Sequence, residues 1–96
     1  MQKLTKRLIG HISVDSGSIM IVDPCYLDEW QPGTHYEAAG NVINKSPHRG
    51  GRILVSGVGG FGIVSQTYDG DGMFPVYGHY DKDKLPIRIT IEFTRN

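Results

Sequence analysis

The sequence predicts an all-β, mainly antiparallel fold, a small β-sandwich or partly open barrel of about six strands with one short helix. Ile and Val together number 17, whereas Leu and Ala number 7, and β-branched residues favour strands over helices. Glycine occupies 13 of the 96 positions and is concentrated between Gly50 and Gly72, where we expect turns and bulges. Residues 87–94 alternate between apolar and polar with a period of two, which is typical of a strand.

Six segments have strand-like patterns, and we expect them to form three consecutive hairpins. Asp15-Ser16-Gly17 has the composition of a tight turn between the first two strands. Ile19–Val22 is continuously apolar, which predicts a central strand covered on both faces. The last strand alternates strictly, which predicts one buried face. The expected strands are 8–14, 18–23, 52–57, 61–67, 74–80 and 87–93.

The segment between Pro24 and Pro47 has a different character. Residues 25–31 can form one short helix, because Pro24 suits the first turn and Pro32-Gly33 stops it. Residues 40–51 are rich in Asn, Ser, Pro and Gly, so we expect a long loop there.

Length and charge limit the classes of function. Ninety-six residues suit a single domain over 1–96. Ten Lys and Arg balance ten Asp and Glu, so no long-range field favours duplex nucleic acid or a membrane surface as a partner. The single cysteine cannot form an intramolecular disulfide, and no apolar run is long enough for a signal peptide or membrane span. We therefore expect a cytoplasmic protein.

Two motifs suggest cofactors but have better structural explanations. Residues 57–62 fit the G-x-G-x-x-G spacing, yet the following residues are β-prone, whereas the dinucleotide fingerprint needs a helix there. Asp69-Gly70-Asp71-Gly72 offers carboxylates for calcium, but Met73 stands where the EF-hand template needs a ligand. We expect turns at both places, with no cofactor and no metal site; the four histidines also lack metal-binding spacing.

Cys25 is the one candidate nucleophile, with histidines as possible bases. No local signature surrounds it, and a lone cysteine is usually a small packing residue. We therefore predict no catalytic residues and no enzyme activity. A small hydrolase that uses Cys25 or an aspartate cluster stays open as an alternative.

The best candidate for binding a small anion is the basic, glycine-rich segment 45–52. Its arginines can bind phosphate oxygens with both arms of the guanidinium, and glycine amides can approach an anion closely. Aromatic side chains from the preceding segment could stack on a base. The competing interpretation is a solvated basic loop. The predicted ligand-binding residues are Lys45, His48, Arg49, Arg52, Trp30, Tyr36 and Tyr26.

Three strings give the chain a family resemblance: Asp15-Ser16-Gly17, Asp23-Pro24-Cys25-Tyr26 and the segment 70–77, Gly-Asp-Gly-Met-Phe-Pro-Val-Tyr. The sequence resembles small, largely uncharacterised β-domain proteins of bacteria and their phages. The resemblance implies a compact β-domain of phage or prophage origin and brings no catalytic residues. The polar residues of these strings fix turns or form a cluster at one end of the sheet; they are Asp15, Ser16, Asp23, Cys25 and Asp71.

These observations predict a non-enzymatic, phage-type binding protein in the host cytoplasm. Its ligand would be small and phosphorylated, by analogy in size with anti-defence proteins that sequester nucleotide-like immune signals. We expect a homo-oligomer, because strand edges need covering. The alternative is an inhibitor or adaptor that binds a host protein.

Overall fold

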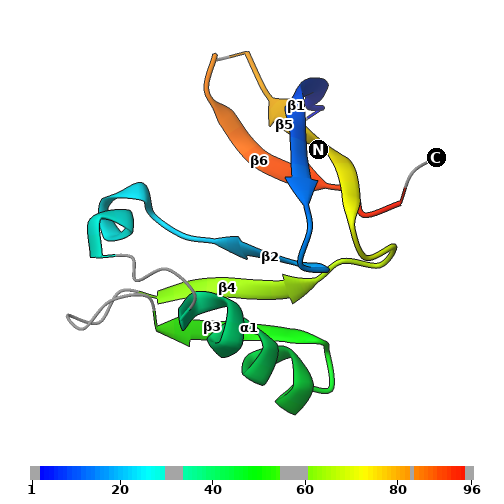
Figure 1. Ribbon diagram of the computed structural model, residues 1–96. Helices are drawn as coiled ribbons and strands as arrows, with labels where there is room; N and C mark the ends of the chain where they lie inside the picture. The colour runs from blue at the N-terminus through cyan, green and yellow to red at the C-terminus, as the bar shows by residue number, and fades with distance from the viewer. Residues whose placement is uncertain (1–2, 30–33, 55–60, 83, 95–96) are drawn as a thin grey trace.

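The computed structural model describes residues 3–29, 34–54, 61–82 and 84–94 of the chain (Figure 1). The elements follow one another as β1 (Thr5–Val14), β2 (Ser18–Ile21), the 3-10 helix η1 (Pro24–Glu29), α1 (Thr34–Lys45), β3 (Gly50–Leu54), β4 (Phe61–Gln66), β5 (Gly72–Tyr80) and β6 (Pro86–Ile91).

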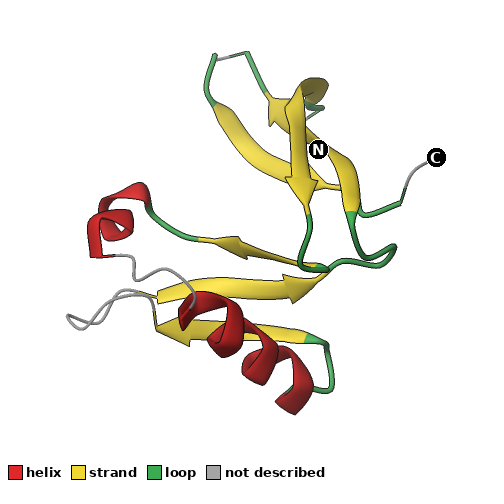
Figure 2. Cartoon of the chain, in the orientation of Figure 1, coloured by secondary structure: helices red, strands yellow, loops and turns green. Residues whose placement is uncertain are grey.

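The strands form two antiparallel sheets of three strands each. One has the order β1-β5-β6 and the other the order β2-β4-β3, and Figure 2 shows them diverging from a shared corner. The predicted all-β, antiparallel class with six strands is confirmed, and the sheets do not close into a barrel. No helix in the described residues is long and apolar enough to cross a membrane.

The two sheets are connected by a long, bent ribbon made of two antiparallel segments of the protein. β1 pairs with β5 and β2 pairs with β4, both antiparallel, so residues 5–21 run beside residues 61–80 across both sheets (Figure 1). The predicted hairpin between the first two strands is therefore wrong. The turn at residues 15–17 redirects the chain into the second sheet instead of reversing it. The predicted pairs β3 with β4 and β5 with β6 are confirmed.

The corner of the ribbon is held by hydrogen bonds around Thr67. The Thr67 amide donates to the carbonyl of Gly17 at 3.0 Å, and the Gly70 amide donates to the Thr67 carbonyl at 3.2 Å. The Thr67 hydroxyl donates to the Gly70 carbonyl at 2.6 Å. Gly17 and Gly70 have φ angles of 72° and 75°, which a side chain would disfavour. The turn predicted around Asp69–Gly72 is therefore part of this corner.

Helix α1 covers one face of the β2-β4-β3 sheet. Ala39 and Ile43 from the helix form the core with Ile53 of β3 and Val64 of β4. This helix is the main error of the sequence interpretation, which expected residues 40–51 to be a loop. The short helix expected at 25–31 is present as η1, up to residue 29.

Two predictions about strand burial are also wrong. β2 is an edge strand, and Ile21 is 50% exposed, so the apolar run 19–22 does not mark a central strand. β6 is the edge of the other sheet, and Ile87 and Ile89 are 55% and 50% exposed. The alternation of apolar and polar residues marks a strand correctly, but neither face of β6 is well covered at the end that contains Ile87 and Ile89.

Two glycines should respond in opposite directions to the same substitution. Gly40 lies inside α1 with open space where a Cβ would be, whereas a Cβ on Gly50 would come within 2.6 Å of the Val64 carbonyl oxygen. Gly40→Ala should stabilise the protein by about 0.5–1 kcal/mol through helix propensity. Gly50→Ala should destabilise it by about 1–3 kcal/mol through overpacking. Urea unfolding of both variants measures these effects, and a stabilising Gly50→Ala would contradict the packing of β3 on β4.

Candidate functional site

A groove lies between α1 and residues 16–18, which lead into β2. It consists of two adjoining hollows of about 350 and 290 Å³, which share Ser16, Ser18 and Tyr36. We call them together the α1–β2 groove. Such volumes are at the lower end of the range for small-molecule sites. The larger hollow is lined by Ser16, Gly17, Ser18, Tyr36, Glu37, Gly40, Asn41, Ile43, Asn44, Arg49 and Gln66, and the smaller adds Ile19, Met20, His35 and Ala39.

Arg49 provides a cation at the larger hollow and is held by its neighbours. Its Nε donates to Gln66 Oε1 at 2.7 Å, and its carbonyl accepts from the Gln66 amide at 3.0 Å. Its φ of 57° lies in the left-handed region, which is uncommon for a residue other than glycine. Nε is the guanidinium nitrogen nearest the side-chain stem, so this bond fixes the orientation of the guanidinium. The two terminal nitrogens can still form the pair of parallel hydrogen bonds that matches a phosphate.

One side of α1 supplies most of the opposite wall. Tyr36, Gly40 and Asn44 follow at a spacing of four, as do Glu37 and Asn41, so they lie on adjacent rows of the helix surface. Gly40 leaves room in this wall, since beyond its own stretch of helix no atom lies within 4 Å of where a Cβ would be. Tyr36 is 67% exposed, which makes its ring accessible to a planar ligand.

The structure brings together only some of the predicted ligand-binding residues. Tyr36 and Arg49 both line the α1–β2 groove. Lys45 and His48 are exposed at and after the end of α1, and neither lines the groove. Tyr26 packs against the core instead. Trp30 lies outside the described residues.

Arg52 lies on the face of the sheet opposite to the helix. Its neighbours in β3 show this: Ile53 belongs to the core beneath α1, and a Cβ on Gly51 would be 3.1 Å from Val42 of the helix. Because side chains alternate along a strand, Arg52 points away from α1. It therefore cannot act with Arg49 on one ligand in the groove.

The predicted polar cluster splits into two parts. Asp15 and Asp71 directly follow and precede the paired residues Val14 and Gly72, so they are neighbours at the corner of the ribbon, where Ser16 also lies. Asp23 and Cys25 lie beyond the other end of β2. An extended chain of five residues from Ser18 to Asp23 spans about 16 Å, so the two parts are not one site.

Asp23 and Cys25 form a local turn at the start of η1. The Cys25 amide donates to Asp23 Oδ1 at 2.9 Å. This bond, together with one from the Cys25 side chain, lowers the pKa of the Asp23 carboxyl. Cys25 is exposed, and the adjacent carboxylate opposes the negative charge that a nucleophilic thiolate needs. This geometry favours a structural role for the pair.

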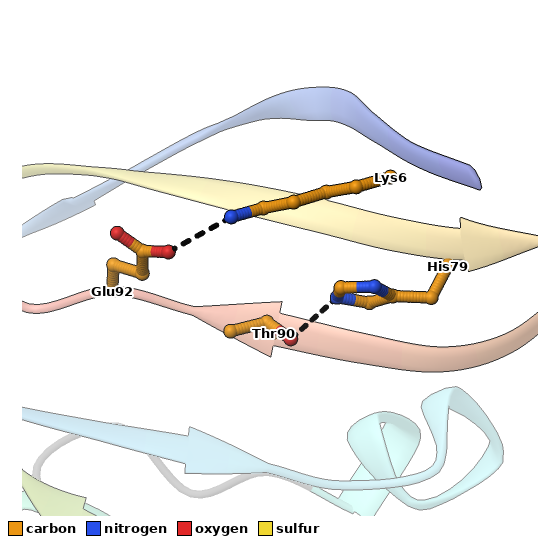
Figure 3. A network of polar contacts seen from close by, with 4 residues as sticks. All are labelled: Lys6, His79, Thr90 and Glu92. Atoms are coloured by element: carbon orange, nitrogen blue, oxygen red, sulfur yellow. Dashed lines mark hydrogen bonds and ion pairs between the residues drawn. The ribbon is translucent and has the colours of Figure 1, made fainter. Parts of the chain in front are cut away.

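A further hollow, of about 580 Å³ and so bigger than either part of the α1–β2 groove, lies on the β1-β5-β6 sheet and is lined by Leu8, His11, Gly72, Met73, Pro75, Tyr77 and Thr94. On the same sheet Lys6 lies 4.2 Å from the centre of the Tyr77 ring and forms an ion pair of 3.2 Å with Glu92. His79 and Thr90 share a hydrogen bond of 2.6 Å nearby (Figure 3). The lining carries no arginine or lysine, so this hollow is less suited to an anion than the α1–β2 groove.

The sequence interpretation missed most of the polar lining of the groove, namely Ser18, His35, Glu37, Asn41, Asn44 and Gln66. A signal for the helix was present: His35, Ala39 and Ile43 are spaced by four, and all three are buried. Recognising that row would have placed Tyr36, Gly40 and Asn44 on the adjacent one.

No protein-family model, curated protein or solved structure matches the chain. Within the described residues, no three His, Cys, Asp or Glu side chains are grouped so that they could hold a metal ion. β4 begins at Phe61, so no helix follows the G-x-G-x-x-G string, whose residues 57–60 lie outside the described part.

The Asp23 carboxyl should titrate below the ordinary range for aspartate, because its charged form accepts hydrogen bonds from Cys25. A lowered folded-state pKa means that its contribution to stability is complete above the unfolded-state pKa and is lost as the pH falls through the folded-state value. NMR titration of the Asp23 side-chain carbon measures this pKa. Asp23→Asn, which keeps an acceptor oxygen, should retain the turn, whereas Asp23→Ala should lose it. A normal or raised pKa for Asp23 would contradict the turn.

Proposed function

We propose that the protein is a non-enzymatic binding protein that takes up a small phosphorylated, nucleotide-like ligand in the α1–β2 groove. The observation that carries this proposal is the placement of Tyr36 and Arg49 on one hollow. An aromatic ring can stack on a base, and an arginine fork can bind a phosphate. A role in sequestering a host signal, in the host cytoplasm, is part of this proposal by analogy in size with anti-defence proteins.

The remaining lining residues suit the polar parts of such a ligand. Ser16, Ser18, Asn41 and Asn44 offer hydroxyl and amide groups that can both donate and accept. Glu37 also lines the hollow. A carboxylate repels phosphate but accepts hydrogen bonds from sugar hydroxyls, as acidic residues do in dinucleotide sites. The groove therefore suits a ligand with a phosphate near Arg49 and a sugar near Glu37.

A second candidate function is binding to a host protein. It is favoured by the apolar residues on the face of the β2-β4-β3 sheet opposite to α1, where Ile21, Leu54 and Ile63 are at least half exposed. Exposed apolar patches mark interaction sites. A pull-down that recovers one host protein in equal amount, with no effect of groove substitutions, would favour this function over ligand sequestration.

Substitution of Arg49 should abolish or strongly weaken phosphate recognition. We expect Arg49→Met to reduce affinity at least tenfold, because a hydrogen bond to a charged group contributes about 1.5–3 kcal/mol. Arg52→Met is the matched control, since it removes the same charge from the opposite face of the sheet. Calorimetric titration with cyclic nucleotides and ADP-ribose derivatives measures both. Equal losses in the two variants, or no binding of any such compound by the native protein, would overturn the proposal.

Substitution of Tyr36 tests stacking separately from charge. Tyr36→Ala should weaken binding by about 1–3 kcal/mol, the contribution of stacking between a base and an aromatic ring. Tyr36→Phe should bind almost as well as the native protein, because it keeps the ring. The side chain is largely exposed, so neither change should alter the unfolding midpoint much. Equal affinity of the Ala and Phe variants for the ligand identified by calorimetry would show that the ring does not stack on it.

A further inference from the structure

Within the part of the chain that the structure describes, β6 pairs on one side only, with β5, and this pairing gives the direction of its backbone groups. The Glu92 amide donates to the Pro75 carbonyl, and residues 88–91 pair with β5 without a break in register. Since hydrogen-bonding direction alternates along an antiparallel strand, residues 88, 90 and 92 face β5. The N–H and C=O groups of Ile89 and Ile91 therefore point away from β5, toward the outer edge; Ile87 lies in the register shift between Pro86 and Arg88 and is not part of this regular pattern.

The sequence of this edge is complementary to itself. When two copies of β6 are placed antiparallel with Thr90 opposite Thr90, Arg88 of each copy lies opposite Glu92 of the other. In the same register Ile89 lies opposite Ile91, so the outward backbone groups of these two residues pair and their apolar side chains meet. Moving the centre to Ile89 would instead place Arg88 opposite Thr90. Only the register centred on Thr90 sets opposite charges opposite each other.

The charged groups are placed for this contact. Arg88 and Ile89 are exposed. Glu92 projects from the same face as Thr90 (Figure 3), and Lys6 contacts its Oε1 atom at 3.2 Å. A carboxylate has two oxygens and can accept from two cations, so a partner's Arg88 adds to the Lys6 contact without replacing it.

The other strand edges are less suited to pairing. β1 has a register irregularity between Leu8 and Gly10, and bulges and basic residues such as Lys6 and Arg7 discourage edge-to-edge pairing. β2 carries no charged residue and β3 carries only Arg52, so neither edge can set opposite charges against a second copy of itself. β6 also has a register shift, between His79 and Tyr80 of β5, but residues 88–91 pair regularly, and with the adjoining Glu92 this edge carries charges of both signs.

We propose that the protein forms a symmetric dimer through antiparallel β6–β6 pairing centred on Thr90, which joins two β1-β5-β6 sheets into one sheet of six strands. The contact is isologous, because the same edge serves both copies. The contact lies on the β1-β5-β6 sheet, whereas Arg49 directly precedes β3 of the other sheet. We therefore expect dimerisation to be independent of ligand binding.

Charge reversal tests both the contact and its register. By light scattering coupled to size exclusion, and by sedimentation, the native protein should have the mass of two chains. Arg88→Glu and Glu92→Arg should each weaken self-association at least about tenfold, because two ion pairs become two repulsive pairs. Mixing these two variants should restore a dimer, since each then places opposite charges against the other. Arg7→Glu, an equal charge change on β1, is the control and should remain dimeric.

Three results would overturn the proposal: a monomeric native protein, a dimer that survives either charge reversal, or a mixture of the two variants that stays monomeric. Cross-linking checks the register without relying on charge. In a Cys25→Ser background, Thr90→Cys should form an intermolecular disulfide on oxidation, whereas Arg88→Cys should not, because it faces residue 92. The reverse pattern would contradict the register centred on Thr90.

Discussion

The arrangement of the two sheets depends on the bend at Thr67 in the ribbon that residues 5–21 and 61–80 form. Thr67 is 2% exposed, and its hydroxyl donates a hydrogen bond to the Gly70 carbonyl. The backbone amide of Thr67 donates to the carbonyl of Gly17 in the other segment of the ribbon. A buried hydroxyl or amide without a partner costs free energy, so these bonds must form together. At the corner, residues 15–17 of one segment lie opposite residues 67–71 of the other. The two segments therefore differ in length there, and this difference lets the ribbon bend. The corner also places Ser16 and Gly17 at the mouth of the groove.

The bend separates two sheets with different surroundings. The β2-β4-β3 sheet is covered by α1, and its small core fixes the helix so that one row of α1 residues faces the groove. The β1-β5-β6 sheet has no helix on it in the described residues. It carries the Lys6–Glu92 ion pair and the His79–Thr90 bond on one face. Its edge strand β6 has no second neighbour among the described strands. The proposed ligand site and the proposed dimer contact therefore lie on different sheets.

Much of the fold followed from local pattern, because β-branched residues and glycine turns mark strands wherever they occur. Pairing did not follow for the first two strands, since Asp15-Ser16-Gly17 has the same composition whether the chain reverses or bends. Helix α1 was missed because Gly40, Asn41 and Asn44 are poor helix formers, and burial of Ala39 and Ile43 outweighs that weakness. The prediction about β2 failed because an apolar run does not say which faces are covered.

For the site, local reasoning identified Arg49 and Tyr36 as residues with suitable chemistry but could not say which partners join them. Arg52 is three residues from Arg49 and faces the other way, because strand alternation decides its side. Ser18 and Gln66 join the groove only through pairing of β2 with β4. Long-range pairing is the information that a single sequence lacks.

The proposed binding site is the α1–β2 groove. Amide chemical shifts, followed by NMR during titration with ADP-ribose and with cyclic nucleotides, test this placement, because every position reports at once. We expect saturable shifts for at least one of these compounds, concentrated at Ser16, Ser18, Tyr36, Asn41 and Arg49, with residues 86–91 of β6 unaffected. Shifts confined to Arg52, Leu54 and Ile63, or no saturable shift with any of the compounds, would contradict it.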